Sequence, residues 1–140
     1  MLFEFILDKK SPLKSYESLY SILNDVEKCL KSNPVEAVLR ARVAEERFIN
    51  AILEINGIEI PDDLGMRKNL KLECTANKLN FLFEKGFINK TQLTYLNAVR
   101  RAGNIVANQK TEDENDIDAN KVVEFLYEAI KIYVENFKEI

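Results

Sequence analysis

The sequence predicts an all-α fold, an up-and-down bundle of four to five amphipathic helices. Apolar residues recur at helical spacing in five separate stretches, and only four glycines and three prolines occur in 140 residues. Apolar residues make up 46% and charged residues 31% of the chain, a balance typical of globular rather than disordered proteins. The length fits one domain, residues 1–140, with residues 1–10 as an N-terminal arm.

The first two helices are predicted from their start signals and apolar spacing. A serine followed by proline indicates a helix from about Ser11 to Lys31, because proline is tolerated at a first helical position. Asn33 and Pro34 start a second helix in the same way. It continues to Ile55 and ends at Asn56-Gly57, a left-handed cap. The two helices should form an antiparallel hairpin.

Three further helices follow, and each has its own boundary signals. They are expected at about Arg67–Lys85 before Gly86, from an Asn89 or Thr91 cap to about Asn108, and at about Asp118–Phe137. Ile58–Gly65 and Gln109–Asp118 have no helical period and are predicted to be loops.

The apolar segment Leu2–Leu7 is predicted to be a short arm or strand that packs on the domain or on a second subunit. It is far shorter than the ~20 residues that span a bilayer, so we expect no membrane contact. Cys29 and Cys74 lack the close spacing of a zinc or redox motif, and we expect two buried free thiols. Free thiols favour a reducing, cytoplasmic location.

The charge and residue types limit the chemistry. Twenty basic against 23 acidic residues give a net charge of −3, so nucleic acid would need a local contact or a partner. The chain has no histidine, and the acidic run 112–114 lacks the alternating ligands of a calcium loop. No glycine-rich phosphate loop follows a strand, which disfavours nucleotide hydrolysis. We therefore predict no metal and no cofactor.

The fourth predicted helix carries a row of polar side chains, the polar stripe, opposite its apolar face. Spacings of four, three and four residues place them on one side of a helix. A solvated surface is one explanation, but asparagine is a mediocre helix former and the set suits hydrogen bonding. Gly103, which lies just before Asn104 on the apolar side of this helix, predicts close approach by a ligand or by another helix. The stripe consists of Asn97, Arg101, Asn104 and Asn108.

The segment from Arg100 to Asn108, RRAGNIVAN, resembles the R..GN...H signature of the HEPN superfamily. It is most similar to the helical domain found at the N-terminus of type I restriction-enzyme motor subunits and as standalone bacterial proteins. That family has an R..E pattern in its second helix, matched here by Arg42 and Glu45 after Pro34. A pair at this spacing is more often an intrahelical ion pair than a catalytic unit. The order of elements is similar from about Tyr16 onward.

The resemblance implies a site between two subunits, with Arg101, Asn104, Asn108 and Glu45 as its residues. Active HEPN ribonucleases end the signature in histidine and cleave RNA without metal, but position 108 is asparagine. An amide cannot relay a proton near neutral pH, so this site is degenerate and cleavage is expected to be absent or disabled. The sequence leaves open whether Asn108 is natural or an inactivating substitution.

Two functions remain as hypotheses. The first is a HEPN-like homodimer of antiviral defence or toxin–antitoxin systems that binds RNA, or an antitoxin or restriction partner protein. The apolar arm and the tyrosines of the first helix are candidates for its dimer interface. The second is a non-catalytic interaction scaffold of the same fold, in which the polar stripe satisfies hydrogen bonds between helices. An unrelated helical adaptor is a third possibility.

Overall fold

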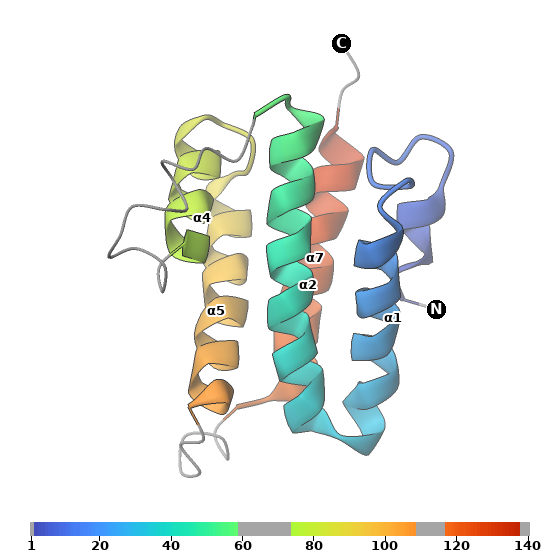
Figure 1. Cartoon of the computed structure of the whole chain (residues 1–140), viewed down its shortest axis with the longest axis vertical. Helices are drawn as coiled ribbons and strands as arrows, with labels where there is room; N and C mark the ends of the chain where they lie inside the picture. Colours follow the sequence, from blue (N-terminus) through green and yellow to red (C-terminus); the bar gives the residue numbers. More distant parts are fainter. Residues whose placement is uncertain (1, 59–73, 109–116, 138–140) are drawn as a thin grey trace.

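The all-α fold is confirmed by a computed structural model, which describes residues 2–58, 74–108 and 117–137 (Figure 1). Within these residues all the regular structure is helical, and no helix is long and apolar enough to cross a membrane. The elements in chain order are the 3-10 helix η1 (Glu4–Leu7), α1 (Glu17–Ser32), α2 (Pro34–Ile55), α4 (Cys74–Glu84), α5 (Lys90–Ala107) and α7 (Ala119–Asn136).

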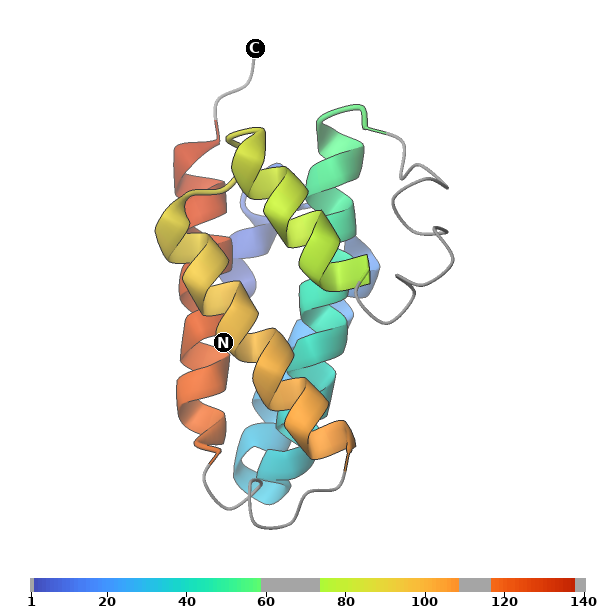
Figure 2. The ribbon, with the colours of Figure 1, turned by 90° about the vertical axis from the view of Figure 1, so that its left-hand side faces the viewer.

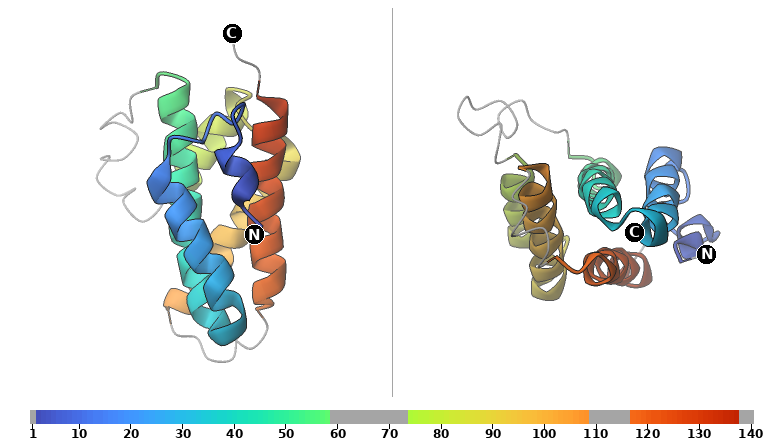
Figure 3. Two further views of the ribbon diagram at one scale, coloured as in Figure 1. Left: turned by 90° about the vertical axis from the view of Figure 1, so that its right-hand side faces the viewer. Right: turned by 90° about the horizontal axis from the view of Figure 1, so that it is seen from below.

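The four long helices α1, α2, α5 and α7 alternate in direction, as expected of an up-and-down bundle (Figure 1). Helices α1 and α2 form the predicted antiparallel hairpin, and α2 also packs against α5, α7 and α4. Seen from below, α1 lies on one side of α2, and α5 and α4 lie on the other (Figure 3). The shorter α4 runs beside α5 and contacts both α2 and α5 (Figure 2).

Most predicted helix ends are confirmed by their capping contacts. The Asn33 side chain accepts a hydrogen bond from the backbone N–H of Glu36 at 3.2 Å, so α2 begins at Pro34 as expected. Gly57 and Gly86 have φ angles of 69° and 80°, the left-handed conformation that ends a helix with glycine. Asp118 caps α7 through the backbone N–H of Lys121. Local side-chain chemistry therefore sets these boundaries.

The first helix begins at Glu17, so its predicted start at Ser11 is wrong. The Ser11 hydroxyl accepts a hydrogen bond from the Leu13 N–H at 3.1 Å, and the Lys14 N–H bonds the Ser11 carbonyl at 3.4 Å. These bonds close a single turn. The backbone of Tyr16 then takes a non-helical conformation, with φ −90° and ψ 73°, which separates this turn from α1.

The N-terminal arm folds as the 3-10 helix η1 rather than as a strand. Phe3 and Ile6 are fully buried, and η1 lies between α1 and α7 in Figure 3. The rings of Phe3 and Phe5 meet that of Tyr127 edge to face, at centroid distances of 5.9 and 5.6 Å. The arm thus packs on its own domain.

Parts of the predictions lie outside the described residues. The third helix is described from Cys74 to Glu84, whereas its predicted start at Arg67 and most of both predicted loops fall in the gaps. Cys29 is a free thiol but is only half-buried, contrary to the expected full burial, because it lies near the end of α1. The side chain of Cys74 is not among those described.

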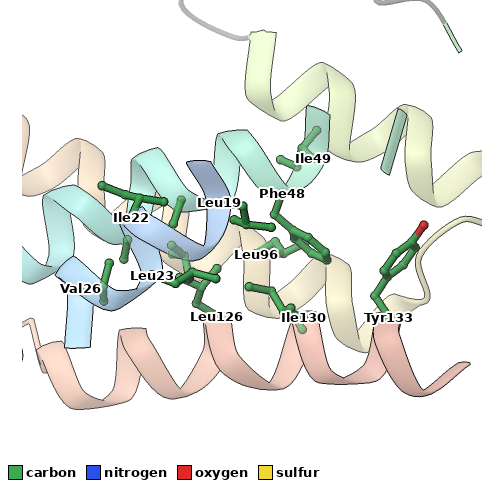
Figure 4. Packing of buried hydrophobic residues seen from close by; sticks show 14 of the residues in the cluster. Leu19, Ile22, Leu23, Val26, Phe48, Ile49, Leu96, Leu126, Ile130 and Tyr133 are labelled. Carbon is green, nitrogen blue, oxygen red and sulfur yellow. The ribbon is translucent and has the colours of Figure 1, made fainter. Parts of the chain in front are cut away.

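The core runs along the centre of the bundle and is closed by apolar side chains from all four long helices (Figure 4). The Phe48 ring of α2 meets the Tyr133 ring of α7 edge to face at 5.7 Å. Residues shown in this region include Leu19, Leu23 and Val26 of α1, Ile49 of α2, Leu96 of α5, and Leu126 and Ile130 of α7. This packing fixes α2 and α5 side by side.

Candidate functional site

The helix that carries the polar stripe is held firmly at its first turn. Asn89 and Gln92 form a capping box, in which each side chain accepts from the other's backbone N–H at 2.8 Å. The amide of Gln92, which is buried, also donates to the carbonyl of Ala129 in α7 at 3.0 Å. The register of α5 against the bundle is therefore fixed before the stripe begins.

The polar stripe lies along the edge of α5, partly in contact with solvent. Asn97 and Asn104 are half-buried, whereas Arg101 and Asn108 are exposed. Asn108 is the residue that ends α5, and its backbone N–H bonds the Asn104 carbonyl at 3.1 Å. The two exposed members are accessible to a ligand, and Asn104 lies between them along α5, whereas Asn97 lies one turn before Arg101.

Helix α2 approaches α5 closely at Gly103. A Cβ atom built on Gly103 would lie 2.7 Å from both Cβ and Cδ of Arg42, and 3.0 Å from its Cγ. These distances are well inside the ~3.5–4.0 Å of ordinary carbon contacts. The stem of Arg42 therefore lies directly on the glycine. The close approach predicted from the sequence is made by a side chain of α2.

Glu45 is a buried carboxyl group in the same part of α2. Its exposed fraction is 0%, and neither carboxyl oxygen has a hydrogen-bond partner among the described residues. Burial raises the pKa of this carboxyl well above its ordinary value of 4.5, and Glu46 acts in the same direction. The charges of Arg100 and Arg42 act against this rise. Burial therefore shifts Glu45 toward its protonated, uncharged form.

Arg100 is the residue that the sequence reasoning missed. It lies four residues after Leu96 and three before Gly103, both buried, so it is on the side of α5 that faces the bundle. It is half-buried, and its charge acts on Glu45. Arg101 points about 100° away along the helix circumference. The spacing from Gly103 is the signal that distinguishes the two arginines.

The guanidinium group of Arg100 is held only by long hydrogen bonds. Its Nε and Nη2 atoms both donate to the Asn97 side-chain oxygen at 3.4 Å, near the limit of a hydrogen bond. The two ion pairs in the described chain both belong to Arg40, which contacts Asp25 and Glu36 at 3.3 and 3.0 Å. The guanidinium groups near Gly103 therefore keep donors for another acceptor.

Two side-chain hydrogen bonds join α2 to α4 next to this site. Lys78, only 8% exposed, donates to the Asn50 side-chain oxygen at 3.1 Å. Thr75 donates to a Glu46 carboxyl oxygen at 3.3 Å. These contacts join α4 to the C-terminal half of α2, so α4 forms one border of the crossing (Figure 2). Glu46 faces this border, whereas Glu45 is buried.

The crossing combines two positive charges with little negative charge. Arg42 lies on Gly103 and Arg100 faces the same side of α5, whereas the exposed Arg101 points away from Gly103. Burial shifts the nearest buried carboxyl, Glu45, toward its neutral form by raising its pKa. Such a cluster suits a phosphate group, whose oxygens accept bidentate hydrogen bonds from guanidinium. No group of three or more metal-ligating side chains occurs in residues 2–58, 74–108 or 117–137. The site thus has the means to bind an anion.

Two cavities lie elsewhere, at the end of the bundle near the last turn of α7. One, of about 300 Å³, is lined by Asn56, Gln92 and Tyr133 among others. The second, of about 610 Å³, lies between the turn at Ser11 and Phe137. Neither is lined by Arg42, Glu45 or any member of the polar stripe.

No protein-family model, curated protein or solved structure matches this chain. A functional proposal therefore depends on the side chains at the α2–α5 crossing.

Proposed function

We propose that this protein is a HEPN-like RNA-binding protein of a defence or toxin–antitoxin system, in which ribonuclease activity is absent or disabled. The guanidinium groups of Arg42 and Arg100 beside Gly103 carry the proposal, and the exposed Arg101 of the polar stripe adds a third positive charge on the outer side of α5. These groups supply local hydrogen-bond donors on a chain whose net charge is −3. RNA binding then depends on this local cluster rather than on the field of the whole protein.

The residues at the site support binding of RNA but not its cleavage. An arginine stabilises the negative charge of a phosphodiester and of its transition state, but cleavage also needs a group that transfers the proton of the 2′-hydroxyl. Asn108 occupies the exposed end of α5 and cannot do this. The buried carboxyl of Glu45 is enclosed at the crossing and is not accessible to a hydroxyl in solution. Binding without turnover follows.

A homodimer is part of the proposal, because the resemblance implies a site shared by two subunits. The exposed position of Arg101 and Asn108 leaves them free to meet a second chain or its bound RNA. The scaffold alternative, in which the polar stripe satisfies hydrogen bonds between helices, has less support. The side-chain bonds that the stripe makes, from Arg100 to Asn97, stay within α5.

The decisive comparison is RNA cleavage by the protein and by its Asn108→His variant, with the oligomeric state recorded by light scattering. We expect the histidine variant to cleave and the parent protein to bind without cleaving. Restoring a general base should raise the rate by about 10²- to 10⁴-fold. Asn97→His is the matched control, because it places an imidazole on the same stripe three turns earlier. If the Asn108→His dimer folds, binds RNA and stays inert, the disabled-ribonuclease proposal is wrong.

A further inference from the structure

The most unusual group in the described chain is the Glu45 carboxyl, which is fully enclosed and has two unpartnered oxygens. Buried polar atoms nearly always have a partner, and a buried carboxylate needs a counter-ion. The two cations that act on Glu45, Arg42 and Arg100, are the same ones that would bind phosphate. One carboxyl and one ligand therefore compete for the same two guanidinium groups.

We infer that Glu45 is an internal competitor of the RNA phosphate, which draws Arg100 and Arg42 inward when it is ionised and releases them to RNA when it is protonated. This inference rests on the proposed function and specifies how its site is regulated. At a pH where Glu45 is ionised in the free protein, binding of a phosphodiester is then accompanied by uptake of one proton from solvent at Glu45. No bond other than O–H forms or breaks.

The two states differ in the partners of the Arg42 and Arg100 side chains. Arg42 lies with its stem on Gly103, and Glu45 follows it by three residues on α2, so the two side chains are neighbours on one helix face. Arg100 faces them from α5 and is held only by its two 3.4 Å bonds to Asn97. Arg100 therefore gives up only these two long hydrogen bonds when it pairs with Glu45.

Few other charged or titratable groups lie near Glu45 and could respond to its protonation. On α2 the neighbour is Glu46, which accepts from Thr75, and the buried cation of α4, Lys78, donates to Asn50. The buried positions of α7 carry apolar side chains and Tyr133, and those of α1 are apolar. The chain contains no histidine, so no imidazole can contribute a neutral-range pH dependence.

The sign of the linkage follows directly. The ionised carboxylate holds the arginines, so affinity for RNA is highest at low pH and falls as pH rises through the pKa of Glu45. One linked proton gives a loss of up to about tenfold per pH unit. Binding is reciprocal, so RNA must raise the pKa of Glu45 by the same coupling. A phosphodiester keeps its charge over this range and does not contribute.

The test is the affinity of a rhodamine-labelled oligouridylate, measured by fluorescence anisotropy at constant ionic strength from acidic to neutral pH. The parent protein should lose affinity with rising pH, and Glu45→Gln should bind with a flat profile at the parent's low-pH affinity. Glu46→Gln, the adjacent exposed carboxyl, is the matched control and should keep the parent's slope. A flat profile for the parent protein, or an unchanged slope in Glu45→Gln, overturns the inference and leaves the proposed function intact.

A second measurement does not depend on any variant folding. A carbon-13 titration of the Glu45 carboxyl, with and without the oligouridylate, should show a higher pKa in the complex. An identical pKa in both states overturns the inference. If the parent protein binds no RNA at any pH, the proposed function is wrong and the inference falls with it.

Discussion

A methyl group at Gly103 should force α2 and α5 apart. The Cβ of alanine would lie 2.7 Å from Cβ and Cδ of Arg42, about 1 Å closer than a relaxed carbon contact. The Cδ can rotate away, but the Cβ of Arg42 is fixed to the backbone of α2. The helices must therefore separate, and the packing around Gly103 must loosen with them.

The expected magnitude comes from two opposing terms. Alanine is the better helix former by about 1 kcal/mol, which favours the variant. Overpacking of a close contact costs about 1–3 kcal/mol, and a backbone-anchored clash belongs at the upper end. We therefore expect Gly103→Ala to lower the free energy of unfolding by about 2 kcal/mol, equivalent to a melting temperature about 4–8 °C lower.

Urea unfolding followed by circular dichroism measures this change, and a double-mutant cycle with Arg42→Ala assigns it. Arg42→Ala removes Cγ and Cδ but keeps Cβ, so the cost of Gly103→Ala should shrink by about 1 kcal/mol without vanishing. Ala98→Gly, in the middle of the same helix, controls for propensity. If Gly103→Ala stabilises the protein by the propensity gain alone, the close helix crossing described above does not exist.

Two further variants test the burial of Glu45 and the cap of α5. Burial raises the pKa of Glu45 in the folded state above its value in the unfolded state. The contribution of Glu45 to stability is therefore fully present below the unfolded-state pKa. Between the two pKa values the free energy of unfolding falls by about 1.4 kcal/mol per pH unit as pH rises. Glu45→Gln should match the parent in acid and exceed it at neutral pH in urea unfolding, and parallel curves would contradict the burial. Asn89→Ala should cost about 1 kcal/mol in thermal unfolding because it breaks the capping box, whereas Thr91→Ala should cost little.

The parts of the fold that were predicted correctly are those decided by local chemistry. Asn33, Gly57, Gly86 and Asn89 act on backbone groups a few residues away, so their effect can be predicted from short sequence patterns. The start of α1 is predicted wrongly because a local signal, that of Ser11 and Pro12, forms a separate turn before the helix. Ser11 and Pro12 are genuine turn formers, but the turn they make ends before Tyr16, where the backbone leaves the helical region.

The candidate site was predicted only in part, because its decisive feature depends on how two helices cross. The sequence indicated Gly103 as a point of close approach and included Glu45 among the site residues. It selected Arg101, which is exposed, and passed over Arg100, which faces α2. Charged residues are seldom fully buried, so no local pattern predicts an unpartnered carboxyl at Glu45.

The salt dependence of RNA affinity tests the central claim, that the α2–α5 crossing binds phosphate, most directly. For single-stranded RNA, each phosphate contact that is removed reduces the slope of log affinity against log salt concentration by about 0.7. Arg100→Ala and Arg42→Ala should each weaken binding and reduce the slope by about this amount. Arg40→Ala should change neither, because Arg40 is paired with Asp25 and Glu36 toward α1. An unchanged slope in both Arg100→Ala and Arg42→Ala, or a parent protein that does not bind RNA, would contradict the account.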